Sequence, residues 1–379
     1  MIRSVFYVEE LNRGGIETFC MNVLRSASRA ELSVSFLVLK RGEYDYAQEA
    51  EKLGASIDYL IADGEEGSHS SRTYKLIKQM RAMRKWASNN KWQVDVLHFN
   101  ASHLANAFPL VLAAKQGGIK KIYLHSHNSY EDGLVNRTLH YGFRPLLPFL
   151  NLSGLLACST EAGEWMFGHG SSFCAIANGV NFQKFQFSQT DRNRIRNMLA
   201  ISRDDLALIY VARFTEPKNH KYLIELFSRL SVLRPDAKLL LCGRGPCEKA
   251  IKELAKEGGI DESVKFLGVC DDIAPLLSAS DCFVFPSNYE GLPVAAVEAQ
   301  VNGLPLLLSD RISPDAVLSS KTLVESLDSS MDTWIDDILK LSVQRFDKPL
   351  FNPEIKKYNI DVTVTRLLEI YEKDANGTQ

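Results

Sequence analysis

Two cations lie close together at the end of an apolar run in the second half of the chain. Arg213 directly follows the sequence LIYVA, and Lys218 comes five residues later, where a helical pattern begins. A guanidinium offers a planar fork of donors and an ammonium offers a compact charge, so the pair suits a diphosphate. Two unrelated surface cations are the alternative interpretation of this segment taken alone.

Two carboxylates flank the start of a second helical segment. Glu290 lies in the loop after the apolar run CFVF, and Glu298 follows with seven residues between them. Pro293 is expected in the first turn of this helix, whose free N–H groups near Leu292 can bind phosphate oxygens. A carboxylate one turn further along can accept hydrogen bonds from both hydroxyls of a ribose. The alternative, a Glu298 without a partner, is costly among the apolar residues of VAAVEAQ.

Glycines and histidines follow two strand-like runs in the first half. Gly14 and Gly15 precede a helical segment, and adjacent glycines let the backbone approach a phosphate. A plain tight turn is the alternative. The dinucleotide-binding fingerprint G-x-G-x-x-G is absent. His125 and His127 end the run KKIYLHSH, where they are either site residues or ordinary polar ends of a strand.

Short apolar runs alternate with helix-length segments along most of the chain. This alternation predicts parallel sheets covered by helices on both faces, with ligands at the carboxyl ends of the strands. The pattern pauses at AIANGVNFQKFQF and resumes near Leu206, so we predict two doubly wound domains, residues 1–180 and 181–360. Strands are expected at 4–10, 31–40, 94–100, 120–127, 154–159, 207–214, 237–245, 263–269, 282–287 and 304–310. Helices are expected at 16–29, 73–89, 103–117, 218–234 and 246–258.

The composition limits the class of protein. A chain of 379 residues, 45% of them hydrophobic, is long enough for two domains of ordinary size. Its formal net charge of −2 argues against a dedicated nucleic-acid-binding protein. No apolar run reaches the ~18–20 residues that span a bilayer, and the N-terminus is typical of a strand and loop rather than a signal peptide. Seven scattered cysteines without a C-x-x-C pair predict free thiols and a cytoplasmic location.

One segment carries a local excess of positive charge. Residues 74–92 contain six basic side chains and no acidic one, with apolar residues such as Met80, Met83 and Trp86 interleaved. An amphipathic helix that contacts an anionic membrane surface is one interpretation. A solvated basic helix that packs on its own sheet is the other.

Five ordered motifs carry a family resemblance. The early GGIE, the ANGV linker, ARFTEPKNH, CGRGP and EGLPVAAVEA run from residue 14 to about residue 310 and resemble glycosyltransferase family 4 of the GT-B-fold enzymes. The HSHNS segment resembles members that build bacterial exopolysaccharide or capsule. The resemblance implies an α/β GT-B fold, in which two Rossmann-like domains face each other across a cleft. It also implies retaining transfer from a nucleotide-diphosphate sugar, with a UDP-sugar as the first expectation.

The resemblance also implies roles for particular residues. Catalytic groups are expected at Arg213, Lys218, Glu290 and His127, and donor contacts at Gly15, Gly243, Gly245, Val269, Cys270, Gly291, Leu292 and Glu298. The cations would hold the diphosphate, Glu298 the ribose and residues 269–270 the base. His127 is favoured over His125 near the donor sugar, as an orienting residue, and the donor phosphate would take the acceptor proton.

Other expectations concern the acceptor and the ends of the site. His98 and Asn100, which end the run VDVLHFN, are candidate acceptor contacts or ordinary strand residues. Asp315 occupies a position where members often carry Glu, which leaves the donor sugar open. No D-x-D ends a strand, so neither a metal nor another cofactor is expected. The last helix, within residues 361–379, is expected to pack back on the first domain.

The expected partners are a nucleotide-diphosphate sugar and a saccharide or lipid-linked saccharide acceptor, with peripheral membrane contact and no nucleic acid. Three other classes of protein remain as alternatives. A sugar-nucleotide epimerase shares the architecture but lacks a segment like EGLPVAAVEA. A catalytically silent binding scaffold is disfavoured by the intact cations and carboxylates. An NAD-dependent oxidoreductase is disfavoured by the missing glycine fingerprint.

Overall fold

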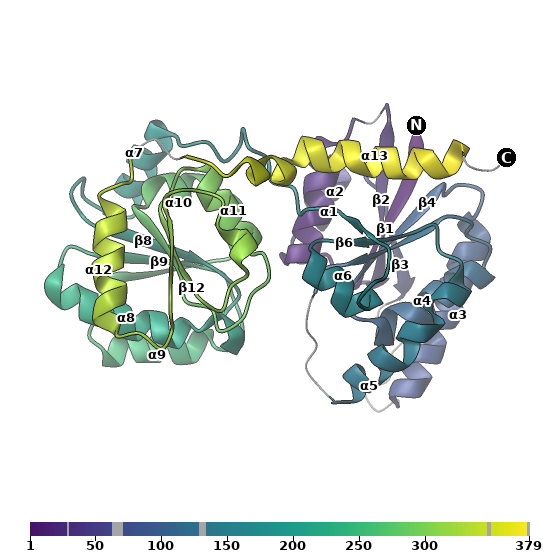
Figure 1. Cartoon of the computed structure of the whole chain (residues 1–379), viewed down its shortest axis with the longest axis horizontal. Coiled ribbons are helices and arrows are strands. Elements are labelled where there is room, and N and C mark those ends of the chain that lie inside the picture. The colour runs from purple at the N-terminus through teal and green to yellow at the C-terminus, as the bar shows by residue number, and fades with distance from the viewer. Residues whose placement is uncertain (29, 63–70, 129–133, 347–349, 377–379) are drawn as a thin grey trace. The chain divides into compact units, whose positions relative to one another are not determined.

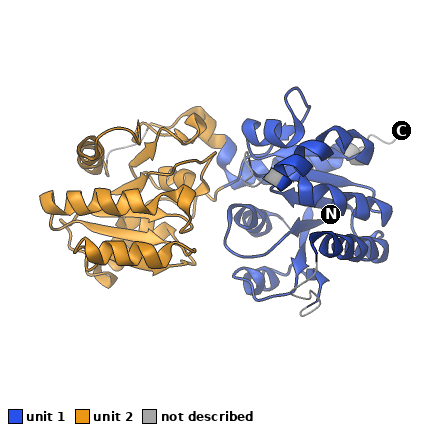
Figure 2. Cartoon of the chain, turned by 90° about the horizontal axis from the view of Figure 1, so that it is seen from below, with its two compact units in different colours: residues 1–179, 357–379 blue, residues 180–356 orange. Residues whose placement is uncertain are grey.

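The computed structural model describes residues 1–28, 30–62, 71–128, 134–346 and 350–376. They form two compact units, coloured separately in Figure 2. Unit 1 contains residues 1–179 and 357–379, and unit 2 contains residues 180–356. The predicted domain boundary, between residues 180 and 181, lies one residue from the boundary of the units.

Unit 1 is built on a parallel sheet. The order β3-β2-β1-β4-β5-β6-β7 places β1 and β4 side by side at the point where the winding reverses direction. The strands are β1 (Ile2–Val8), β2 (Leu32–Lys40), β3 (Ile57–Ile61), β4 (Val96–Ala101), β5 (Ile122–Ser126), β6 (Gly154–Ala157) and β7 (Cys174–Ala175). In an open sheet, the crevice at such a reversal is the usual place for a ligand.

Apolar side chains fill both faces of this sheet, because successive strand residues point to opposite sides. Tyr7 and Phe99 belong to the core under α3, α4 and α6, whereas Phe6 belongs to the core under α1, α2 and α13. The helices of unit 1 are α1 (Gly15–Ser26), α2 (Ala47–Lys52), α3 (Arg72–Asn90), α4 (Leu104–Gln116), α5 (Leu134–Phe143), α6 (Thr160–Phe167) and α13 (Ile360–Asn376), with the 3-10 helix η1 (Arg144–Leu150).

The last helix, α13, packs on unit 1 beside α1 (Figure 1). Ser26 of α1 donates to the carboxylate of Asp361 at 2.8 Å, and the Thr363 hydroxyl donates to the Ala177 carbonyl at 3.1 Å. Farther along, the Tyr123 hydroxyl of β5 donates to the Ile370 carbonyl at 3.1 Å. Polar bonds therefore tie both the start and the later turns of α13 to unit 1.

The basic segment 74–92 lies within α3 and its C-terminal end, and most of its apolar side chains turn inward. Met83 is fully buried, and Met80 and Trp86 pack against the core of unit 1. The Trp86 indole also donates to Asp58 at 2.8 Å. The apolar face of α3 thus packs on its own sheet. In the described residues, no helix combines the length and apolar character needed to cross a bilayer.

Unit 2 repeats the design with the order β10-β9-β8-β11-β12-β13. The strands of its sheet pair in parallel, with β8 and β11 at the reversal. The strands are β8 (Ala207–Val211), β9 (Lys238–Cys242), β10 (Val264–Gly268), β11 (Cys282–Phe285), β12 (Leu306–Ser309) and β13 (Thr322–Glu325). The helices are α7 (Gln189–Met198), α8 (His220–Leu233), α9 (Glu248–Glu257), α10 (Ala274–Ala279), α11 (Val294–Val301) and α12 (Met331–Ser342), with η2 (Glu216–Lys218) and η3 (Pro314–Ala316); η4 (Pro353–Tyr358) crosses from unit 2 into unit 1. Two doubly wound α/β units confirm the predicted fold class.

A buried charged cluster holds the C-terminal end of α10. Arg192 donates to the carbonyl oxygens of residues 278–280 at 3.0–3.2 Å, and Arg345 donates to that of Ser280 at 2.8 Å. Asp281 pairs with Arg192 at 2.7 Å and with Arg196 at 3.3 Å. Burial lowers the pKa of Arg345 to about 9. Cations at a helix C-terminus complement its dipole, so the cluster is a structural element of unit 2.

Candidate active site

The predicted cation pair lies where β8 ends and α8 begins. Lys218 ends the short helix η2 and forms an ion pair with Glu290, from the loop between β11 and α11. Arg213 is exposed in the same loop as Lys218. The structure therefore joins two motifs that lie 72 residues apart in the sequence.

Backbone bonds hold the loops around Lys218 together. The Asn288 N–H donates to the Pro217 carbonyl at 2.8 Å, and the Asn219 amide donates to the Pro286 carbonyl at 3.0 Å. The loop after β12 joins them, because the Ser313 N–H donates to the Glu290 carbonyl at 3.1 Å. Asn219 has a φ of 53°, a conformation that Asn adopts more readily than most residues and that ends η2 and opens α8. The ends of β8, β11 and β12 thus form one rigid rim.

Burial lowers the pKa values of two side chains at this rim. It lowers the pKa of Lys218 to about 8, while the Glu290 carboxylate favours the charged form. Burial, followed by repulsion from Lys218, lowers the pKa of His220 to about 4. The neutral His220 ring stacks on Phe214 with 4.0 Å between ring centroids. His220 is therefore part of the support for Lys218 rather than a second cation.

The two glycines of CGRGP have a clear packing reason. A Cβ on Gly243, whose φ is +140°, would lie 2.0 Å from the Ala212 carbonyl oxygen, and one on Gly245 would lie 2.3 Å from that of Phe214. The loop after β9 is thereby drawn against the loop that carries Arg213. Their expected contact with a nucleotide remains a prediction.

Val269 and Cys270 follow β10 at the same edge of the sheet. The Cys270 thiol lies 3.7 Å from the Gly268 carbonyl oxygen, and it interacts with the thiol of Cys242 at the end of β9. This interaction and burial raise the pKa of Cys242 well above its ordinary value. Both groups are free thiols, as predicted for all seven cysteines. Their expected place beside the base of the donor remains a prediction.

Glu298 lies in the second turn of α11, as expected, and is 7% exposed. Gly291 and Leu292 precede the helix and are half-buried. Pro293 is the N-cap, so the helix begins one residue later than predicted. The expected first-turn proline is wrong by that one position, since its ψ of 121° lies outside the helical range.

In unit 1, three histidines gather on the face covered by α13. His98 is fully buried, with its Nδ1 2.5 Å from the Tyr371 hydroxyl and its Nε2 2.9 Å from Nδ1 of His125. Because both ring nitrogens are occupied, His98 is not available for the expected acceptor contact. Burial is the main cause that lowers the pKa of His98 to about 3 and that of His125 well below its ordinary value.

His127 differs from its neighbours because it is only half-buried. Its Nε2 lies 2.9 Å from Oδ1 of Asn100, while the Asn100 amide nitrogen donates to the Tyr7 carbonyl at 3.1 Å. Asn100 thus supports His127, and the acceptor contact considered above remains a prediction. This arrangement makes Nε2 the donor and Nδ1 the acceptor of the neutral ring, and a hydrogen bond with Asn178 also acts on the ring. Burial lowers the pKa of His127 to about 3, so the ring is neutral at physiological pH.

Gly15 begins α1, directly after the N-cap Gly14. A Cβ on Gly15 would meet no atom within 4 Å. The folded chain therefore does not need a glycine at this position, and the open space is available to another group. The expected contact with a diphosphate remains a prediction.

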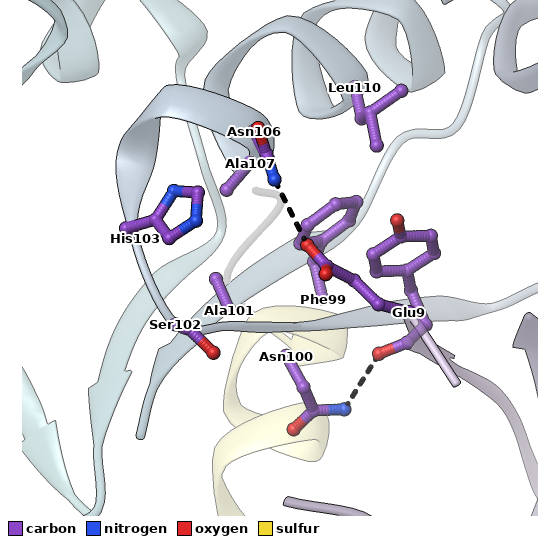
Figure 3. Close-up of a pocket in the computed structure, with 10 residues that line it drawn as sticks. Glu9, Phe99, Asn100, Ala101, Ser102, His103, Asn106, Ala107 and Leu110 are labelled. Carbon is purple, nitrogen blue, oxygen red and sulfur yellow. Dashed lines mark hydrogen bonds between the residues drawn. The ribbon is translucent and has the colours of Figure 1, made fainter. Parts of the chain in front are cut away.

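A small polar recess lies at the carboxyl ends of β1 and β4 in unit 1 (Figure 3). Its lining includes Tyr7, Glu9, Asn100, His103 and Asn106. Apart from Asn100, sequence reasoning did not identify these residues. The rule that ligands bind where the winding reverses could have found them, but only once the strand order was known.

Two doubly wound parallel units are the architecture of the GT-B fold. The family described as "Glycosyl transferases group 1" matches residues 191–341. EpsF of Bacillus subtilis (strain 168), which carries a provisional glycosyltransferase name, is 30% identical over 99% of this chain and 98% of its own. The chain belongs to the group 1 glycosyltransferases, and the predicted family is confirmed.

Two further similarities extend the comparison. The capsular polysaccharide biosynthesis glycosyltransferase CapH of Staphylococcus aureus is 24% identical over 98% of this chain and 99% of its own. The crystal structure of Anabaena HepE in complex with UDP and glucose superposes with a TM-score of 0.75, covering 98% of this chain and 100% of that chain at 15% identity. The latter similarity supports the fold, and the former links the family to polysaccharide biosynthesis.

Proposed function

We propose that this chain transfers a sugar, with retention of configuration, from a UDP-sugar to a saccharide hydroxyl in the synthesis of a cell-surface polysaccharide. The observation that carries the proposal is the cation pair of Arg213 and Lys218 at the rim of unit 2, in a member of this family. A UDP-sugar is favoured because HepE, a protein of the same fold, was crystallised with UDP and with UDP-glucose.

The chemistry requires the charge of the leaving diphosphate to be neutralised. Lys218 is paired with Glu290 in the free protein, and the donor diphosphate would replace that carboxylate as its partner. Glu290 would then be free to accept a hydrogen bond from a hydroxyl of the donor sugar. Each preorganised donor of this kind contributes on the order of 3 kcal/mol to transition-state stabilisation. With two cations for this task, we propose transfer without a required metal or other cofactor.

The neutral state of the His127 ring limits the role that this residue can have in the reaction. The neutral ring, whose Nε2 hydrogen is bonded to Asn100, suits a positioning role rather than that of an acid. His127 would therefore orient a hydroxyl of the donor sugar. The proton of the attacking acceptor hydroxyl would pass to the leaving phosphate oxygen, and the new bond would form on the face that the phosphate leaves.

We also propose a lipid-linked acceptor and contact with an anionic membrane surface. Arg72 at the start of α3 donates to Asn136 of α5 at 2.6 Å, so these two helices adjoin. Apolar side chains are exposed on both, with Tyr74 at 60% and Val135 at 61%. Exposed apolar groups beside basic ones are typical of interfacial contact. Charge reversal at Lys78, Arg81 and Arg84 should abolish sedimentation with phosphatidylglycerol vesicles, and unchanged sedimentation contradicts the contact.

Activity is tested by nucleotide release from UDP-, GDP- and ADP-sugars with lipid-linked and simple glycosides, in the presence of EDTA. We expect acceptor-dependent UDP release and a product with the anomeric configuration of the donor by NMR. Lys218→Ala should lower turnover strongly. Lys221→Ala is the matched control, because that side chain is 74% exposed in the first turn of α8, three residues after Lys218. Nucleotide binding without release would instead support the silent scaffold.

A further inference from the structure

The recess at the carboxyl ends of β1 and β4 is small. It has room for about one water-sized group, and its lining combines polar and apolar side chains. Phe99 stacks on Tyr7 with 4.1 Å between ring centroids, and Ala107 and Leu110 of α4 complete the apolar part (Figure 3). A recess of this size suits one hydroxyl of a larger molecule rather than a whole ring.

Tyr7 supplies an unused hydrogen-bond donor. It lines the recess and is 1% exposed, and its hydroxyl has no hydrogen-bond partner among the residues that the structure describes. A buried hydroxyl without a partner costs about 1–3 kcal/mol, so such groups usually bind water or a ligand. Burial and the nearby Glu9 charge raise the pKa of Tyr7 well above its ordinary value. The phenol therefore keeps its proton and remains a donor.

Glu9 supplies the complementary acceptor. It follows β1 directly, and its Oε1 accepts a hydrogen bond from the Asn106 amide of α4 at 3.3 Å (Figure 3). A carboxylate has more lone pairs than this one bond uses, so capacity remains for another donor. Its negative charge opposes an anion at the start of α4. The recess thus selects a neutral polar group over a phosphate.

We infer that this recess binds one hydroxyl of a sugar, which accepts a hydrogen bond from Tyr7 and donates one to Glu9. An alcohol needs one donor and one acceptor, and the recess presents both beside apolar walls that suit the C–H groups of a sugar ring. The inference rests on the proposed function, because the family defines the ligands as sugars. It adds a specific subsite in unit 1 and two residues that determine acceptor or donor recognition.

The subsite is tested by saturation-transfer NMR on the full chain with methyl glycosides of glucose, galactose and N-acetylglucosamine and their monodeoxy forms. We expect one glycoside to bind, with one deoxy form losing about tenfold in affinity. Tyr7→Phe and Glu9→Gln should each lower the affinity for the glycoside by a similar factor. Each variant should then bind that deoxy form and the parent glycoside with equal affinity. Glu10→Gln is the matched control, because this exposed neighbour bonds to Asn12 instead.

The outcomes distinguish a lost subsite from an unfolded chain and from a failure of the proposed function. Tyr7→Phe should keep or raise the Tm, because it removes a buried hydroxyl without a partner, so its loss of binding would not reflect unfolding. Competition by UDP-glucose assigns the hydroxyl to the donor sugar, and binding that persists beside it assigns the hydroxyl to the acceptor. Absence of glycoside binding, or equal binding by all variants, overturns the inference. Absent sugar transfer with intact glycoside binding would refute the proposed function alone.

Discussion

The depressed pKa of Lys218 makes activity depend on pH in a specific direction. The ammonium must be charged to neutralise a diphosphate, and burial lowers its pKa to about 8 in the free protein. At pH 9 only about one tenth of the molecules would carry the charge. Because kcat/KM reports the free enzyme, its value for the donor should bend downward near pH 8 and fall about tenfold per pH unit above the bend.

The assay is the initial rate of UDP release at low donor concentration between pH 6.5 and about 9.5. Lys218→Arg should lower the rate at every pH, since a guanidinium has a different shape, but it should remove the bend because it stays charged. Lys221→Ala should keep the bend of the wild type. A flat wild-type profile to pH 9.5, or an equal bend in Lys218→Arg, would refute the assignment of this group.

Single substitutions elsewhere have expected outcomes of different kinds. Gly15→Ala should leave the Tm unchanged in scanning fluorimetry but lower donor kcat/KM, because its methyl group would take the open space proposed for the diphosphate; unchanged kcat/KM would count against that role. Gly243→Ala should instead lower the Tm or prevent folding, because of the contact with a carbonyl oxygen; a wild-type Tm would contradict this. Glu298→Ala should chiefly weaken UDP binding, by about tenfold or more in calorimetry, whereas an unchanged Kd would remove it from the ribose site. Asp281→Ala should lower the free energy of unfolding in urea by about 3–5 kcal/mol, because it leaves buried Arg192 without its counter-charge; a loss below about 1 kcal/mol would contradict this.

The central strands could be predicted from sequence because they are buried on both faces. The runs that contain Leu208 and Phe283, for example, are continuous and apolar, as parallel central strands must be. Two edge strands, β3 and β13, gave no such signal, although the edge strand β10 was predicted. β3 and β13 are short and mostly half-buried, and Val324 of β13 is 49% exposed, so their apolar pattern is weak.

The residues of the site also differ in how far the sequence alone predicts them. Arg213 and Lys218 were found because cations directly after an apolar run are a local signal. The pairing of Lys218 with Glu290 is not local, since it depends on β8 and β11 being neighbours in the sheet. The recess at Tyr7 and Glu9 was missed for that reason as well. Its residues acquire meaning only when β1 and β4 are known to adjoin at the reversal of the winding.

The histidines show a further limit of sequence reasoning. His98 and His127 both lie within runs predicted as strands, and their positions alone do not distinguish them. The structure separates them, because Tyr371 of the last helix occupies one nitrogen of the fully buried His98, whereas His127 is only half-buried. Contacts with a helix at the far end of the chain cannot be read from the local pattern.

The most direct test of the account is a thermal-shift panel with UDP, GDP, ADP and their sugar conjugates, with EDTA present. A ligand that binds only the folded chain raises its Tm in proportion to the logarithm of ligand excess over Kd. We predict that UDP and one UDP-sugar raise the Tm of the wild type, and that Arg213→Ala and Lys218→Ala reduce this shift while Lys221→Ala preserves it. No shift with any nucleotide, or equal shifts in all variants, would contradict a diphosphate site at these two cations.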